Sequence, residues 1–465
     1  MRPDGLPDGL GDEPGDARQR AAAEVSSGEL APGGPLGLYV HFPFCGVHCP
    51  YCDFAVDARA DIPHHRYAEA VIGEITARAS WFGWGATAEA VGGRPPLASI
   101  YFGGGTPGLW RPDAVASVIA AGLRSFTVTD LAGGEAKDQA AGQGGGAIEI
   151  TVEANPGEVT EQHLRALRNA GVNRLSLGLQ SLEDRLLRVL GRNHDAAAGP
   201  AAVRLARAVG IENLSVDLMF GLPGQSFDDW RRVVDQVVAL APPHVSAYAL
   251  TIERGTPFGA RARKGERMAA DNDLAARMQE WVRDALAAAG LAQYEVSSYA
   301  RPGMRAVHNG LYWNGAPYLG VGASAASFRP LSDGSGWRFS NPRATDTYLR
   351  AAAQGGPIGP IGPMGPMGPT GPTGPAGSGS PLPAQVEKRT RADLENEAVW
   401  LALRTSDGID RAAHGRRFGS DPVVTRQSEI ARCVERSWLQ VDAHSVRPTP
   451  SGLLFADEIA TRLWR

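Results

Sequence analysis

The sequence is short of the features that mark several common classes of protein. It has only four cysteines in 465 residues, which excludes a disulfide-stapled scaffold. It contains no apolar run long enough for a transmembrane helix, so none is expected. The acidic, Gly- and Pro-rich N-terminus lacks the basic and apolar regions of a signal peptide. We therefore expect a cytoplasmic, soluble protein.

Lysine is also scarce, and there is no surplus of positive charge. The chain has 46 Lys+Arg against 50 Asp+Glu, for a formal net charge of −4, and only three of the cations are lysines. A nucleic-acid partner or a polybasic membrane contact needs a positive surplus, so we expect neither. At roughly 100–200 residues per domain, the length predicts two to three domains.

Short β-rich runs alternate with amphipathic helical stretches from residue 37 onward. Thr160 and Ser226 occupy N-cap positions, and Asp229 completes a capping-box spacing after Ser226. Parallel strands need crossover connections, so the alternation predicts an α/β fold with a parallel sheet. Six units are fewer than a closed eight-stranded barrel needs, which predicts a partial (βα)6 barrel. The expected strands are 37–42, 98–102, 148–152, 174–179, 213–219 and 244–250, and the expected helices are 64–79, 112–125, 160–170, 182–190, 200–209 and 226–240.

The composition of the chain also indicates where its domains and linkers lie. Residues 356–376 form seven Gly-Pro-X triplets, which we interpret as a semi-rigid polyproline-II spacer rather than a trimerising collagen-like stalk. The C-terminal part reads as mostly helical, with a short β segment near Trp438–Val441 and Val446–Pro448 and a final helix from Ser451; a winged helix is one option. The expected organisation is a disordered tail (1–34), a β/α core (35–255), an α+β extension (256–350), the spacer (351–390) and a C-terminal domain (391–465).

Three of the four cysteines stand in one short loop after the first predicted strand. Cys45, Cys49 and Cys52 lie in HFPFCGVHCPYCDF, whereas the fourth cysteine lies far away in the C-terminal domain. A structural zinc site takes four ligands, and apart from His41 and His48 no second set of ligands accompanies this loop. Three thiolates also suit a 4Fe–4S cluster with one iron left open to a small chelating cofactor. We favour the cluster over a zinc site or a redox loop.

The CX3CX2C spacing in this setting resembles the radical S-adenosylmethionine (SAM) superfamily, in which SAM chelates the open iron. The stretch Gly103-Gly104-Gly105-Thr106-Pro107 follows the second predicted strand and resembles the GGTP motif, which holds the SAM amino group. The run from Leu36 to roughly Phe328, with GLQSLEDRLLRVLGRNHD and SVDLMFGLPGQS, resembles the oxygen-independent coproporphyrinogen III oxidases and their HemW-type relatives.

This resemblance implies SAM-pocket roles for residues at the ends of the predicted strands. Glu153, Gln180 and Asp217 lie at or near the ends of the third, fourth and fifth strands, the rim where β/α barrels build their sites. The alternatives are strand-end capping for these residues, packing for the tyrosines and a solvated helix-terminal charge for the arginine. The residues to which the resemblance assigns SAM binding are Tyr39, Tyr51, Gly105, Thr106, Glu153, Gln180, Arg192 and Asp217.

Two features separate the HemW type from the oxidase. The oxidase pattern continues CX3CX2CXC, and Phe54 stands here in place of the last cysteine. His308-Asn309-Gly310-Leu311-Tyr312-Trp313 matches the HNXXYW motif of HemW-type proteins, for which a haem-binding role is proposed. Imidazole ligates haem iron, and Tyr and Trp offer flat faces to a porphyrin. The alternative is a packed histidine with satisfied hydrogen bonds.

The resemblance implies a haem chaperone with a 4Fe–4S cluster and SAM as cofactors and haem as cargo, held by His308, Asn309, Tyr312 and Trp313. The implied partners are acceptor haemoproteins such as respiratory enzymes, and a membrane would be reached only through such a partner. The alternatives are a coproporphyrinogen III oxidase, which would consume SAM, and a radical SAM enzyme of unknown substrate. The residues leave open whether SAM is cleaved.

Overall fold

The computed structural model describes residues 25, 34–82, 96–128, 148–353 and 384–465. The Gly-Pro-X triplets lie outside these residues, as does the expected tail except for Val25 and Gly34, and Val25 is buried in the main core. Within the described ranges, no helix has the length and apolar character needed to cross a membrane.

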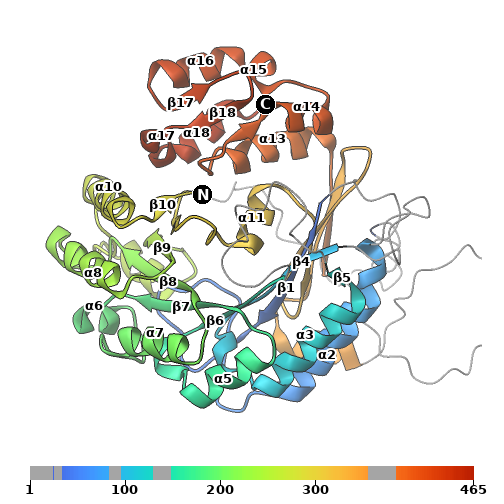
Figure 1. The fold of residues 1–465 in the computed structure, drawn as a ribbon, viewed down its shortest axis with the longest axis vertical. Helices are drawn as coiled ribbons and strands as arrows, with labels where there is room; N and C mark the ends of the chain where they lie inside the picture. Colours follow the sequence, from blue (N-terminus) through green and yellow to red (C-terminus); the bar gives the residue numbers. More distant parts are fainter. Residues whose placement is uncertain (1–24, 26–33, 83–95, 129–147, 354–383) are drawn as a thin grey trace, which may run out of the picture.

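One large curved sheet forms the centre of the molecule (Figure 1). Its six central strands are parallel and adjacent in sequence order, and helices join them along one face, which confirms the predicted partial barrel. The strands are β1 (Leu36–Phe42), β4 (Pro96–Gly104), β6 (Glu149–Ala154), β7 (Arg174–Gln180), β8 (Asn213–Phe220) and β9 (His244–Ala249). The helices are α2 (His64–Arg78), α3 (Pro112–Ser125), α5 (Glu161–Asn169), α6 (Asp184–Val189), α7 (Ala198–Ala208) and α8 (Phe227–Leu240).

Local sequence signals fix where two of these helices begin. The Thr160 side chain accepts a hydrogen bond from the His163 amide at 3.2 Å at the start of α5. At the start of α8, Ser226 and Asp229 form both hydrogen bonds of a capping box, at 2.8 and 3.1 Å. Each bond satisfies an amide that lacks an intrahelical partner. Both predicted N-caps are therefore confirmed.

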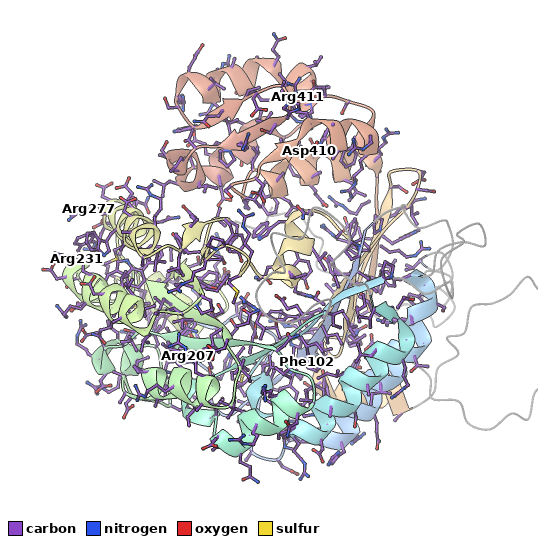
Figure 2. The ribbon with its side chains drawn as sticks, viewed as in Figure 1. Phe102, Arg207, Arg231, Arg277, Asp410 and Arg411 are labelled. Atoms are coloured by element: carbon purple, nitrogen blue, oxygen red, sulfur yellow. The ribbon has the colours of Figure 1, made fainter. Side chains whose placement is uncertain are left out.

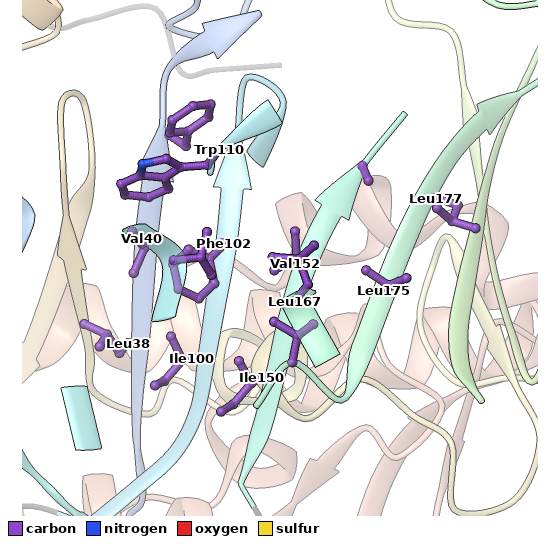
Figure 3. Close-up of a cluster of buried hydrophobic side chains, with 14 of the residues drawn as sticks. Leu38, Val40, Ile100, Phe102, Trp110, Ile150, Val152, Leu167, Leu175 and Leu177 are labelled. Carbon is purple, nitrogen blue, oxygen red and sulfur yellow. The ribbon is translucent and has the colours of Figure 1, made fainter. Parts of the chain in front are cut away.

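The parallel strands have one apolar face and one polar face, because successive side chains of a strand point in opposite directions. The apolar face packs against the helices, as Figure 3 shows for Leu38, Val40, Ile100, Phe102, Ile150, Val152, Leu175 and Leu177. The register of the strands places a second set on the opposite face, which includes Tyr39, Ser99, Tyr101, Glu149, Glu153, Arg174, Ser176 and Asp217. The barrel interior is thus lined by polar and aromatic groups.

The sheet extends past the six predicted strands at both edges. β12 (Tyr318–Val321) pairs parallel to β1 and is followed by antiparallel strands β13 (Ala326–Pro330), β14 (Gly336–Ser340) and β15 (Gln385–Arg389). At the other edge, β11 (Ser298–Ala300) pairs antiparallel to β9 and to β10 (Ala292–Gln293). Helix α11 (Val307–Trp313) lies between β11 and β12 in the chain and contacts β4.

The predicted spacer 351–390 is too long at both ends. Helix α12 (Thr345–Ala353) continues past residue 350. β15 belongs to the main sheet, because its backbone pairs with β14 over five residues and Val386 packs against the core. Three consecutive residues of this edge strand, Glu387, Lys388 and Arg389, are charged, and that composition is hard to distinguish from a linker.

The C-terminal domain has the order helix, strand, three helices, two strands and two helices. Without the four-residue helix Pro422–Thr425 and the last two helices, this is the order of a winged helix. Its sheet runs β16–β18–β17, and Cys433 lies in its separate core. The predicted final helix is two helices that meet at Phe455, whose φ of −109° and ψ of +20° are not helical. Gly452 in the first of them approaches Trp438 so closely that a Cβ would lie 1.9 Å from the Trp438 carbonyl oxygen. The elements are α13 (Arg391–Ala402), β16 (Ile409–Asp410), α14 (Arg411–Phe418), α15 (Pro422–Thr425), α16 (Gln427–Glu435), β17 (Leu439–Val441), β18 (Ser445–Pro448), α17 (Pro450–Leu454) and α18 (Ala456–Leu463).

Charged side chains cover the outer helices (Figure 2). Arg231 of α8 lies over the Trp281 ring of α10 (Asn272–Ala288), and Arg277 of α10 lies over the Phe227 ring of α8, each 4.9 Å from the ring centroid. These reciprocal cation–π contacts join the two helices at the surface.

Candidate functional site

The three clustered cysteines lie on the loop that leaves β1 at the carboxyl end of the parallel strands. Cys45 is buried, and Cys49 and Cys52 are half-buried. The loop is closed at its base by the pairing of β2 (Phe44–Cys45) with β3 (Asp57–Ala58). Burial raises the pKa of Cys45 to about 11, and the neighbouring thiols add to the effect. Iron replaces the thiol proton when it binds, so cluster binding would release the proton of Cys45.

Polar groups donate to two of the sulfur atoms. The Thr106 hydroxyl is 3.5 Å from Cys45 Sγ, and Arg192 Nη1 is 3.9 Å from Cys49 Sγ. Hydrogen bonds to cysteine sulfur are a main means of tuning an iron–sulfur centre. In the described part of the chain, no three His, Cys, Asp or Glu side chains converge on a single ion. A cluster that takes one thiolate at each of three irons does not require such convergence, so the residues fit a cluster.

The two histidines near the loop are occupied by other partners. His41 Nδ1 is 3.2 Å from the Tyr39 hydroxyl, and His41 Nε2 is 3.1 Å from the Ala55 carbonyl oxygen. His48 Nε2 lies 3.4 Å from the Cys52 carbonyl oxygen. His41 therefore ties β1 to the cysteine loop.

The glycine-rich loop lies directly against the cysteine loop. The amides of Gly105 and Thr106 donate to the carbonyls of Phe42 and Phe44 at 2.8 and 2.9 Å. A Cβ at Gly105 would lie 2.6 Å from the Phe44 carbonyl oxygen, so a side chain there would push the loops apart. Gly104 adopts φ +115°, which also favours glycine.

Two half-buried carboxyl groups lie on the interior face of the sheet. Glu153 accepts hydrogen bonds from the Tyr101 hydroxyl at 2.7 Å and the Gly104 amide at 3.2 Å. Burial raises the pKa of Glu153 to about 7, and the charge of Asp217 adds to the effect. Burial also raises the pKa of Asp217, which accepts from the hydroxyls of Ser176 at 2.8 Å and Ser215 at 3.0 Å. Carboxyl groups shifted in this way are typical of a ligand site.

The carboxyl end of β7 contacts the loop that follows α6 through a hydrogen bond from Arg192. Gln180 has φ +62°, a left-handed conformation that is uncommon for a residue other than glycine. Arg192 donates to the Gly178 carbonyl at 3.0 Å and to the Asn155 side chain. Tyr51 packs against Phe258, with ring centroids 6.3 Å apart, and burial raises its pKa. The predicted SAM residues thus come together around the cysteine loop and the adjoining interior.

The predicted haem motif forms α11, which is anchored in the barrel interior. His308 is 1% exposed, and its ring stacks on Tyr101 with centroids 4.9 Å apart. Its Nδ1 is 2.8 Å from the Ser99 hydroxyl, and its Nε2 is 2.9 Å from the Tyr312 hydroxyl. Burial lowers the pKa of His308 to about 3, so the imidazole is neutral. Both ring nitrogens are engaged in this conformation, and iron could reach Nε2 only after the Tyr312 hydroxyl moves.

The other members of the motif are less enclosed. Asn309 and Trp313 are half-buried. Glu149 on β6 accepts hydrogen bonds from the amides of Val307 and His308 at 2.9 and 3.0 Å, and Arg174 lies 3.9 Å from this carboxylate. A buried carboxylate therefore fixes the first turn of α11.

Comparison with known proteins agrees with this geometry. Residues 39–237 match the model of the Radical SAM superfamily, and residues 390–455 match that of the HemN C-terminal domain. A protein named Heme chaperone HemW from Haemophilus influenzae is 36% identical over 317 residues, which cover 68% of this chain and 76% of the relative. One of the same name from Mycobacterium tuberculosis (strain H37Rv) is 33% identical over 401 residues, 85% of this chain and 88% of the relative. The chain belongs to the HemW family.

Membership of the radical SAM superfamily implies SAM and a 4Fe–4S cluster as cofactors. A solved structure of coproporphyrinogen III oxidase (HemN) from Escherichia coli matches with a TM-score of 0.70 over 98% of this chain and 94% of that one. At 19% identity this likeness shows the fold alone. Phe54, at the place of the extra cysteine in the oxidase pattern, is 71% exposed beside the cysteine loop. The named HemW relatives favour the HemW type over the oxidase, as Phe54 predicts.

Three further residues at this edge of the HemW-family barrel were not identified from the sequence. Asn155, Glu158 and Asn193 line a small pocket together with Cys49, Thr106 and Arg192. Asn155 donates to Thr106 Oγ1 at 3.2 Å and to Glu158 at 3.1 Å, so it links the glycine-rich loop to the pocket wall. The signal was available, because Asn155 and Asn193 stand next to predicted site residues in VEANP and LGRNHD.

Proposed function

We propose that the protein is a haem chaperone that carries a 4Fe–4S cluster on Cys45, Cys49 and Cys52, binds SAM beside it, and delivers haem to acceptor haemoproteins such as respiratory enzymes. It would act in the cytoplasm and reach a membrane only through such an acceptor. The observation that carries the proposal is the position of Tyr101. Its hydroxyl donates to Glu153 in the expected SAM pocket, and its ring stacks on His308 in the expected haem motif.

Each group of the candidate site has a separate role in this proposal. The cluster, when bound, would offer its open iron to SAM and supply either an electron for SAM cleavage or a binding signal. Glu153 and Asp217 provide negative charge or hydrogen-bond acceptors for a cationic ligand. His308 supplies a neutral imidazole, the form that ligates iron, once Tyr312 releases Nε2. Asn309, Tyr312 and Trp313 would contact the porphyrin.

An anaerobic haem titration of the reconstituted protein, followed at the Soret band, tests the proposal. Wild type is expected to bind one haem saturably, and His308→Ala is expected to weaken binding about tenfold or more, equivalent to one lost iron ligand. His244→Ala is the matched control, since His244 is equally buried in the interior and bonds Ser215 and Tyr294.

Each alternative outcome has a definite meaning. Absence of saturable haem binding in wild type would refute a haem carrier. Equal weakening in His308→Ala and His244→Ala would show a general effect of disturbing the interior and remove His308 from the haem site.

A further inference from the structure

A pocket lies where α11, the extended edge of the sheet and the C-terminal domain meet. Tyr318 and Phe328 supply aromatic walls from β12 and β13, and Leu394 of α13 closes the apolar part. Arg338 of β14 and Arg417 of α14 bring positive charge to the same space. The pocket thus combines flat apolar surface with guanidinium groups from two domains.

The positive charge of the pocket is only partly neutralised. Glu397 also lines it and is held by Arg338 through two hydrogen bonds, at 2.8 and 3.1 Å, and by Arg389 at 2.6 Å. Arg417, in contrast, donates one long hydrogen bond, with Nη2 3.4 Å from the Gly315 carbonyl oxygen, and lies over the Phe418 ring at 4.9 Å. Glu397 acts on it through its charge, but no carboxylate of the described ranges forms an ion pair with it. A half-buried guanidinium with no carboxylate in direct contact is a binding element for a carboxylate.

The pocket adjoins the haem motif through one side chain. The Tyr312 ring lines the pocket and makes an edge contact with Tyr318, with centroids 4.7 Å apart. The same ring makes a second edge contact with His308, with centroids 5.0 Å apart. The Tyr312 hydroxyl is hydrogen-bonded to Nε2 of that histidine. A ligand entering the pocket therefore meets the residue that covers the imidazole.

We propose that this pocket receives the propionate-bearing edge of the haem cargo, with Arg417 pairing a propionate and Tyr318 and Phe328 contacting the porphyrin edge. This inference rests on the proposed function and adds the part of the chain that recognises the carboxylates. A guanidinium matches a carboxylate in a two-bond geometry, and the aromatic walls match the ring. Displacement of Tyr312 by the porphyrin then frees His308 Nε2 for the iron. The C-terminal domain, which supplies Arg417, becomes a haem-binding element.

The test compares haem with haem dimethyl ester, in which both propionates are masked, by titration of the reconstituted full-length protein. Wild type is expected to bind haem at least tenfold more tightly than the ester, as a charged hydrogen bond in a half-buried site provides. Arg417→Gln is expected to lose this preference, with weaker haem binding and unchanged ester binding. Arg416→Gln, which alters the exposed neighbour on α14, is expected to keep it.

Arg417→Lys guards against an effect of misfolding, because it keeps the charge and should retain part of the preference. Equal binding of haem and ester by wild type would overturn the carboxylate subsite and leave the haem carrier intact. Equal loss of both ligands in Arg417→Gln, with Arg417→Lys behaving in the same way, would also overturn it. Absence of binding of either ligand by wild type would overturn the proposed function itself, and the subsite with it.

Discussion

Single side chains in the barrel interior serve two neighbours at once. Tyr101 joins Glu153 to His308, and Tyr39 stacks on Tyr101 while bonding His41 beside the cysteine loop. Ser99, two residues before Tyr101 on the same face of β4, contacts Nδ1 of His308 at 2.8 Å. Three successive contacts between side chains, His41 to Tyr39, Tyr39 to Tyr101 and Tyr101 to His308, thus connect the cysteine loop with the haem motif.

The cysteine loop gives the first prediction at this scale. Cys45→Ala should abolish the 4Fe–4S cluster after anaerobic reconstitution, because two thiolates rarely retain such a centre. Cys433→Ala is the matched control, since Cys433 is buried in the core of the C-terminal domain. Iron and sulfide analysis and the visible absorbance measure the outcome. Unchanged iron in Cys45→Ala would refute the ligand assignment, and loss in Cys433→Ala would make Cys433 a ligand.

The sequence identified the cysteine loop but not the environment of His308. Ligand spacing is local, so Cys45, Cys49 and Cys52 can be grouped from the chain alone. The partners of His308 are Ser99, which is 209 residues away, and the ring of Tyr101. Nothing in the periodicity of either segment shows that α11 crosses β4 with these side chains facing each other. The satisfied hydrogen bonds of this histidine therefore became evident only in three dimensions.

At the scale of elements, α11 depends on its surroundings. A helix of seven residues is too short to be stable alone in water. Glu149 satisfies two amides of its first turn, and Arg174 balances the carboxylate. The helix that carries the HNXXYW motif is therefore positioned by strands β6 and β7.

Removing this anchor should destabilise the protein measurably. Glu149→Ala leaves the amides of Val307 and His308 without an acceptor and removes the carboxylate beside Arg174, which keeps its hydrogen bond to Asn213. We expect a cost of about 2–4 kcal/mol in the free energy of unfolding. Glu149→Gln keeps one acceptor oxygen and should cost about 1 kcal/mol. Glu161→Ala, which removes an exposed helix ion pair with Arg165, should change it by less than about 0.5 kcal/mol. Urea unfolding gives the three values, and equal effects of Glu149→Ala and Glu161→Ala would contradict the anchoring role.

The elements also separate what periodicity predicts from what it does not. The six parallel strands and their helices were placed within a few residues, because apolar alternation and N-caps are encoded locally. β12 and β15 were missed. β12 is a four-residue segment whose partner, β1, lies some 280 residues earlier, and β15 begins nine residues after the last Gly-Pro-X triplet. Short edge strands owe their existence to pairing partners rather than to their own sequence.

At the scale of the whole molecule, the C-terminal domain is seated on the barrel through its backbone (Figure 1). The Val296 amide donates to the Arg404 carbonyl, and the Ser406 amide donates to the Tyr294 carbonyl, both at 2.9 Å. An ion pair of 2.7 Å joins Arg305 to Asp407 beside them. The pocket with Arg417 lies on the other side of this contact, across α11. A haem edge that enters the pocket would therefore be bound between two domains that already contact each other.

The Gly-Pro-X segment between α12 and β15 yields the last prediction. Replacing 356–376 by a Gly/Ser linker of equal length should leave the melting temperature within about 2 °C and leave cluster and haem binding unchanged. The reason is that both flanks are held independently of the repeat. In α12 the Tyr348 hydroxyl donates to buried Glu74 at 2.7 Å, and β15 pairs with β14 along its whole length.

Val386→Asp in β15 provides the contrast, because it places a charge where a side chain packs against the core and should lower the free energy of unfolding by about 2 kcal/mol or more. Size-exclusion chromatography with light scattering checks the linker variant for a change in assembly. A lower molar mass after replacement would mean that the triplets associate between chains, and loss of cluster or haem binding with unchanged mass would mean that the repeat acts on the site. With both quantities unchanged, the connection between sheet and C-terminal domain resides in β15 and the domain contact rather than in the repeat.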